Sequence, residues 1–182
     1  MEIQSGGQAK VLVLGLGNEI MGDDAVGLFV ARELKTRWGR ALDVVEASIA
    51  GFALLDLLKG FDRVLIVDAI ATGNSPPGTV VELSPDEFQK KSTFSPHFVG
   101  LTDVVGLADK LDIPFPPTIR ILGIEVEDPF VVREGLSETI AESVKSLLSR
   151  AELILLEWGI TRPVDVGQQK GERKSLNRFS QG

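Results

Sequence analysis

The chain has 182 residues, of which 43% are hydrophobic and 25% are charged, and its formal net charge is −7. This length and composition are typical of one globular domain with a substantial core. The lack of cysteine excludes a disulfide framework, thiolate metal sites and a cysteine nucleophile. The acidic balance argues against nucleic-acid binding. Since no apolar run matches a signal peptide or a membrane span, we expect a cytoplasmic protein without membrane insertion.

Strand-like and helix-like segments alternate along the chain, which predicts a largely parallel sheet covered on both faces by helices. The first strand is a continuous apolar run, as expected for a strand buried on both sides. The predicted strands cover residues 11–16, 43–47, 63–69, 79–83 and 119–126. The predicted helices follow the first two strands, begin at Ser84 and at Ser95, and extend from Ser137 to about Leu156.

Composition also predicts how the chain is divided. We expect a flexible N-terminal segment over residues 1–9 and a single α/β domain over residues 10–160. Residues 161–182 contain few apolar side chains and no periodicity, so we expect a disordered polar tail there. We expect the protein to be a monomer.

The first predicted strand leads into a glycine-rich turn and two adjacent carboxylates. Gly15 and Gly17 indicate a turn that another segment approaches closely, or that needs a positive φ. A dinucleotide-binding fingerprint would place a third glycine where this chain has Ile20. The carboxylates of Asp23 and Asp24 would also repel a pyrophosphate, so this mode of binding is disfavoured. The two aspartates are either a functional acidic pair or the cap of the following helix.

A third acid, Asp68, lies near the carboxyl end of the apolar strand predicted over residues 63–69. Because the carboxyl ends of parallel strands meet at one edge of a sheet, Asp68 is expected close to Asp24. The simpler alternative is that Asp68 caps the next element or accepts backbone hydrogen bonds in the loop.

His97 is the only histidine in the chain. If Ser95 caps a helix, His97 lies in its first turn, where the helix dipole favours the neutral ring that ligates metals or acts as a base. The alternative is a solvent-exposed loop histidine. Two carboxylates and one imidazole would form an open site for a divalent first-row ion. A Ser95–His97–Asp68 triad ranks lower, because residues two apart at a helix start do not face each other.

Short motifs follow one another in a fixed order between residues 11 and 156. They are Gly15-Leu16-Gly17-Asn18, Gly22-Asp23-Asp24-Ala25-Val26-Gly27, Val67-Asp68-Ala69, Pro77-Gly78-Thr79, Ser95-Pro96-His97 with Gly100-Leu101, and Leu122-Gly123-Ile124-Glu125. In this order, and with the single histidine at its place in the series, they resemble the maturation endopeptidases of nickel–iron hydrogenases.

The resemblance implies an endopeptidase that removes a C-terminal extension from the precursor of the hydrogenase large subunit, once nickel has been inserted. It implies a three-layer α/β sandwich of the phosphorylase/hydrolase-like type, with a twisted, mostly parallel sheet. The metal-binding positions of the family fall on Asp24, Asp68 and His97, and Asp23 completes the acidic pair. The nickel is expected to arrive with the substrate, although other divalent ions could bind in vitro.

Two mechanisms are compatible with the resemblance. In the first, Asp24, Asp68 and His97 reach the nickel, which polarises the scissile carbonyl or lowers the pKa of a bound water. Asp23 then positions that water or acts as a base. In the second, the metal only permits binding, and a pair of carboxylates carries out acid–base hydrolysis. Many family members have a Gly-Gly-Thr-like turn where this chain has residues 46–51, a segment that we expect to border the substrate groove.

Two other functions fit part of the pattern. Gly-Leu-Gly-Asn after an apolar strand also occurs in peptidyl-tRNA hydrolases, but these need a histidine soon after the first strand and a basic groove. This chain is acidic and has no histidine before His97, so that function is set aside. The alternative function is a non-catalytic metal- or nucleotide-sensing α/β protein, because ligands for binding and for catalysis look alike in a sequence.

Overall fold

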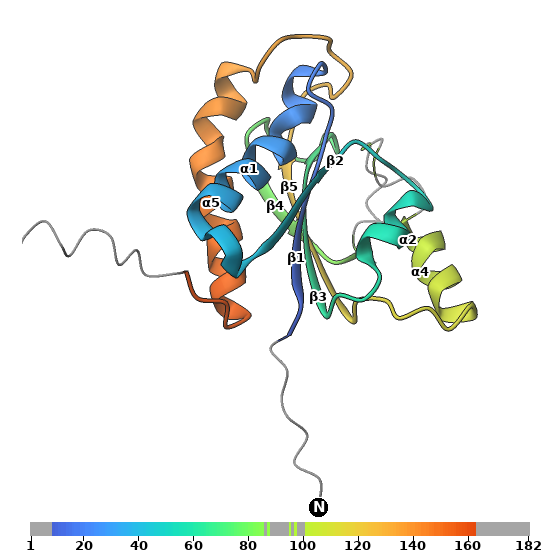
Figure 1. Ribbon diagram of the computed structural model, residues 1–182. Helices are drawn as coiled ribbons and strands as arrows, with labels where there is room; N and C mark the ends of the chain where they lie inside the picture. The colour runs from blue at the N-terminus through green and yellow to red at the C-terminus, as the bar shows by residue number, and fades with distance from the viewer. Residues whose placement is uncertain (1–8, 86, 88–94, 96, 98–100, 163–182) are drawn as a thin grey trace, which may run out of the picture.

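The computed structural model describes residues 9–85, 87, 95, 97 and 101–162 (Figure 1). Each of the five predicted strands is present, with ends within one residue of the predicted ends. The predicted terminal segments 1–9 and 161–182 lie outside the described residues, apart from Ala9, Thr161 and Arg162. In chain order the elements are β1 (Val11–Leu16), the 3-10 turn η1 (Gly22–Ala25), α1 (Val26–Trp38), η2 (Gly39–Ala41), β2 (Asp43–Ala47), α2 (Ala53–Leu58), β3 (Arg63–Ile70), β4 (Val80–Leu83), α4 (Leu101–Lys110), β5 (Thr118–Glu125) and α5 (Glu138–Glu157).

The strands form one five-stranded sheet in the order β2-β1-β3-β5-β4. The pairs β1–β2, β1–β3 and β3–β5 are parallel, whereas β4 pairs antiparallel with β5 at the edge. Figure 1 shows α1 and α5 on one face of the sheet and α2 and α4 on the other. The predicted three-layer α/β sandwich with a mostly parallel sheet is therefore confirmed.

The sheet separates the core into two apolar clusters, and the central strand β3 contributes side chains to both. Leu65, Val67 and Ala69 belong to the cluster that packs against α1 and α5. Ile66 and Ile70 belong to the cluster that packs against α2. Because side chains alternate between the faces of a strand, Asp68 points to the same face as these two isoleucines. The polar site therefore forms on the α2 and α4 side of the sheet.

The predicted helix starts at Ser84 and Ser137 are confirmed. The Ser137 hydroxyl accepts a hydrogen bond from the Ile140 amide at the start of α5. At Ser84 the capping box is complete: Glu87 N donates to the Ser84 hydroxyl at 3.3 Å, and Ser84 N donates to Glu87 Oε2 at 2.9 Å. The rest of the helix that begins after Ser84 falls outside the described residues. Among the helices that the structure describes, none has the length and apolar character to cross a membrane.

Candidate active site

Three buried polar side chains converge near the carboxyl ends of β1 and β3. Asp24 lies in η1, Asp68 lies in β3, and His97 lies in a turn before α4. Both aspartates are fully buried, and His97 is 6% exposed. One potential ligand atom from each residue lies within 4.8 Å of the other two. The expected proximity of Asp24 and Asp68 is therefore confirmed, and the single histidine completes the group.

Both ring nitrogens of His97 have partners. Nε2 lies 3.1 Å from Oδ2 of Asp24, and Nδ1 lies 3.2 Å from the carbonyl oxygen of Ile49. Because a carbonyl oxygen can only accept, Nδ1 must carry a hydrogen and donate it to Ile49. In a neutral ring, Nε2 then presents a lone pair to the Asp24 carboxylate. That contact is favourable only when a proton or a cation lies between the two atoms.

The predicted placement of His97 in the first turn of a helix is wrong. His97 lies in a turn, and the described part of α4 begins at Leu101. Burial lowers the pKa of His97, but the hydrogen bond with Asp24 and the charges of Asp68 and Asp24 outweigh burial. The net effect raises the pKa of the imidazole, because two carboxylates surround the ring.

Asp68 is the second anchor of the site. Its Oδ1 accepts a hydrogen bond from the Ala69 amide at 2.9 Å, and its Oδ2 accepts one from the Ser95 hydroxyl at 2.5 Å. Burial raises the pKa of Asp68 to about 7, and this effect exceeds the opposing influences of His97 and Ser95. Asp68 therefore changes its protonation state close to neutral pH.

The surroundings of the Asp24 carboxylate indicate whether the three-residue group suits a cation. Its Oδ1 atom is buried and has no hydrogen-bond partner among the described residues. A buried carboxylate oxygen without a partner is unfavourable, and a bound cation would compensate it. Two carboxylates and one imidazole are hard and borderline ligands that suit divalent first-row ions. The residues present therefore fit a metal such as nickel.

Asp23 does not join this group. Its Oδ1 accepts hydrogen bonds from Arg133 Nη2 at 2.8 Å and from Ser137 N at 2.6 Å, on the α5 side of the sheet. The two adjacent aspartates therefore point to opposite faces. The role of Asp23 in positioning water or acting as a base stays a prediction.

The lower-ranked Ser95–His97–Asp68 triad does not form. The hydroxyl of Ser95 donates to Asp68 and accepts a hydrogen bond from the backbone amide of His97 at 3.3 Å. The ring nitrogens of His97 contact Ile49 and Asp24 instead. Ser95 therefore orients Asp68, and neither ring nitrogen of His97 contacts its hydroxyl as the triad would require.

Two supporting contacts were not predicted. The Ile49 carbonyl, which sets the orientation of His97, lies within the segment that departs from the family pattern. Glu125, at the end of β5, is buried and accepts hydrogen bonds from the amides of Thr72 and Gly73 and from the Thr72 hydroxyl. The contact with the Ile49 carbonyl could not be predicted, because every residue has a backbone carbonyl whatever its side chain. The only sequence signal for Glu125 was its place in the motif Leu122-Gly123-Ile124-Glu125.

The contacts of Gly17 explain why the turn after β1 begins with a glycine. A Cβ atom at Gly17 would lie 2.2 Å from the carbonyl oxygen of Asp24. The backbone of η1 therefore packs directly on the end of β1, and this contact brings Asp24 to the site. The predicted close approach at this glycine is confirmed.

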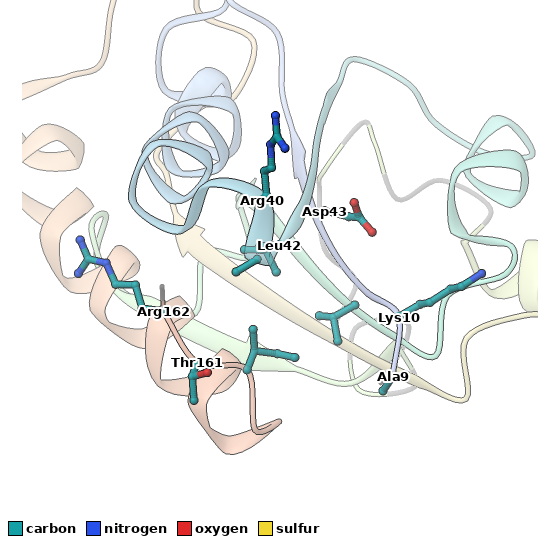
Figure 2. Close-up of a pocket in the computed structure, with 10 residues that line it drawn as sticks. Ala9, Lys10, Arg40, Leu42, Asp43, Thr161 and Arg162 are labelled. Atoms are coloured by element: carbon teal, nitrogen blue, oxygen red, sulfur yellow. The ribbon is translucent and has the colours of Figure 1, made fainter. Parts of the chain in front are cut away.

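A separate cavity of about 620 Å³ lies at the opposite edge of the sheet, where β1 and β2 begin (Figure 2). Its lining includes Lys10, Arg40, Asp43 and Arg162. The three basic side chains point in different directions instead of converging on one point (Figure 2). Since functional groups of open α/β sheets gather at the carboxyl ends of the strands, we assign the chemistry to the Asp24, Asp68 and His97 group.

The comparison with known families decides the class of protein. The family model described as "Hydrogenase maturation protease" matches residues 28–154. The chain belongs to the hydrogenase maturation protease family. It is therefore a peptidase, a class of hydrolase, and this membership favours the enzyme over the non-catalytic sensor considered above.

Individual relatives agree with this membership. The hydrogenase 2 maturation protease of Escherichia coli K12 is 29% identical over 157 residues, which cover 83% of this chain and 93% of that protein. The structure of the hydrogenase maturating endopeptidase HybD from E. coli superposes with a TM-score of 0.72 at 28% identity, covering 82% of this chain and 94% of that one. The [NiFe] hydrogenase maturation protease HybD from Thermococcus kodakarensis gives a TM-score of 0.63 at 30% identity, covering 80% and 98%.

Proposed function

We propose that this peptidase removes a C-terminal extension from the nickel-loaded precursor of a nickel–iron hydrogenase large subunit. In this proposal the nickel belongs to the substrate, and Asp24, Asp68 and His97 contact it. Cleavage is then restricted to precursor that already carries the metal. The names of the relatives, which refer to hydrogenase 2 and to [NiFe] hydrogenase maturation, support this class of substrate.

The observation that carries the proposal is the unsatisfied state of the three-residue group. Asp24 Oδ1 is buried without a described partner, and the geometry at Ile49 leaves the Nε2 lone pair of neutral His97 directed at Asp24 Oδ2. A divalent cation would satisfy both atoms at once. Three protein ligands also leave coordination positions for the scissile carbonyl or a water, as in catalytic rather than structural metal sites.

The structure favours the first of the two mechanisms. The substrate's nickel would supply Lewis acidity at the scissile carbonyl or at a bound water. The residues of the chain fix the geometry: Ile49 orients His97, and Ser95 orients Asp68. Hydrolysis by a carboxylate pair that includes Asp23 is less well supported, because Asp23 Oδ1 is engaged by Arg133 and Ser137 on the other side of the sheet.

The test is intact-mass analysis of a cognate large-subunit precursor, with and without nickel, after incubation with the protein. We expect loss of a C-terminal peptide only from the nickel-loaded precursor. No change in the mass of a verified nickel-loaded precursor would contradict the proposal.

Variants identify the residues responsible. Asp68→Ala and His97→Ala are expected to abolish processing, whereas Asp56→Ala is the matched control. Asp56 is an exposed aspartate on α2 that pairs with Lys59, so its removal should leave the rate unchanged. Undiminished processing by a folded Asp68→Ala or His97→Ala variant would remove the assigned site.

A further inference from the structure

The loop between β5 and α5 is joined to the turn that carries Asp24, and Arg133 is the point of attachment. The Arg133 amide donates to the carbonyl of Ile20 at 3.2 Å, and the Gly22 amide donates to the carbonyl of Arg133 at 3.0 Å. Met21 and Arg133 also form an isolated parallel β-bridge. The backbone of Arg133 thus makes two hydrogen bonds with the chain that enters η1, one to Ile20 and one from Gly22, the first residue of η1.

The side chain of Arg133 continues this attachment. Its Nη2 donates to Asp23 Oδ1 at 2.8 Å, and the Ser137 amide donates to the same oxygen at 2.6 Å. The side chain of Asp23 is only 14% exposed, so the ion pair is partly shielded from solvent. Asp23 is therefore fixed on the α5 side, at the start of a 20-residue helix.

The adjacent residue, Asp24, depends on this arrangement. Its carboxylate is hydrogen-bonded to His97 through Oδ2, while Oδ1 has no partner in the described part of the chain. No described backbone donor contacts this carboxylate, so its position depends on the contact with His97 and on the backbone of η1. That backbone is pressed against Gly17 on one side and held by Arg133 through Asp23 on the other.

We propose that Arg133, acting through Asp23, is a positioning residue. It holds Asp24 in place beside Asp68 and His97, so that the three side chains can contact the metal together. The inference rests on the proposed function. In this arrangement Asp23 needs only an oxygen that accepts two hydrogen bonds, which an asparagine also provides. A general base, in contrast, needs an ionisable carboxylate. The two roles of Asp23 therefore predict different results for Asp23→Asn.

The test compares Arg133→Met, Arg133→Lys, Asp23→Ala and Asp23→Asn with the wild type. The matched control is Arg37→Met, because Arg37 also makes ion pairs, with Glu33 and Glu152, on the α1 and α5 side. The first measurement is the rate of cleavage of nickel-loaded precursor. The second is the imidazole NMR signal of metal-free protein at one fixed pH, which is assigned directly because His97 is the only histidine.

We expect Arg133→Met and Asp23→Ala to lower the cleavage rate about 10- to 100-fold, the range for residues that support metal ligands. Both should also shift the His97 signal, because its partner Asp24 moves. Arg133→Lys should recover part of the rate. Arg37→Met should resemble the wild type in both measurements. Asp23→Asn should cleave faster than Asp23→Ala and give a His97 signal closer to that of the wild type, because the asparagine oxygen can still accept both hydrogen bonds.

Two results would overturn the inference. One is a wild-type rate and a wild-type His97 signal in Arg133→Met. The other is loss of cleavage in Asp23→Asn with an unchanged His97 signal, which would identify Asp23 as the base. If the wild type itself cleaves no nickel-loaded precursor, the proposed function fails, whereas the His97 signal still tests the positioning role.

Discussion

Nε2 of His97 lies 3.1 Å from Oδ2 of Asp24 inside the fold. Because the other ring nitrogen donates to the Ile49 carbonyl, this contact holds either a proton or a metal ion. Proton and metal therefore compete for the same place. This competition links the stability of the metal-free protein, its response to pH and its activity.

The contribution of Asp68 and His97 to the stability of the metal-free protein should fall as pH rises from about 4 to above 7. The pKa of Asp68 is raised from 3.8 to about 7 by folding, so the folded state holds one more proton than the unfolded state between these values. Stability then decreases with pH across this window. The raised pKa of His97 acts in the same direction above pH 6.5. Urea unfolding at a series of pH values measures the trend, and a rise in stability from this site across the window would contradict it.

Asp68→Asn should stabilise the metal-free protein at pH 8 while abolishing cleavage. The difference between about 7 and 3.8, about 3 pKa units, corresponds to an upper limit of about 4 kcal/mol for relieving the buried charge. Asparagine can still accept from Ala69 N and donate to the Ser95 hydroxyl, so both hydrogen bonds can persist. Urea unfolding of both proteins at pH 8 gives the comparison. A less stable variant would show that Asp68 is not destabilising when ionised.

Cleavage of nickel-loaded precursor should weaken as pH falls below about 7. Metal ligands must be deprotonated, and Asp68 takes up a proton in this range because its pKa is raised to about 7. The raised pKa of His97 acts in the same direction, since it favours the protonated ring. Initial rates between pH 5.5 and 8.5, about one to two units either side of the pKa of Asp68, measure the effect. The chosen pH values must leave nickel in the precursor, which its mass verifies. A rate that increases toward acid pH would argue against ligation by these residues.

Gly17→Ala should destabilise the fold by about 1–3 kcal/mol or more and reduce cleavage. The new Cβ would lie 2.2 Å from the backbone oxygen of Asp24, and backbone atoms cannot rotate away as a side chain can. Gly106→Ala is the matched control, because no atom lies within 4 Å of a Cβ at that position in α4. That change should be neutral or stabilise the helix by up to about 1 kcal/mol. Thermal unfolding and the cleavage assay test both variants, and equal effects would contradict the packing argument.

The element pattern was predictable because it depends on local chemistry. The apolar run of β3 and the capping signals at Ser84 and Ser137 act within a few residues, and the structure confirms each of them. The antiparallel direction of β4 was not predictable, since it depends on how the loop over residues 72–78 returns the chain to the edge of the sheet. Glu125 holds this loop from a distance of more than 50 residues in sequence.

The sequence by itself determined the fold class, the family resemblance and the identity of three site residues. Few polar residues follow the predicted strands, and the chain has one histidine. Asp24, Asp68 and His97 could therefore be named as candidate metal ligands before their geometry was known. Only the tertiary structure decided how they are held. The Ile49 carbonyl fixes the ring of His97, and Arg133 draws Asp23 away from the site. These contacts join segments distant in the chain, and their direction depends on which face of the sheet each side chain takes.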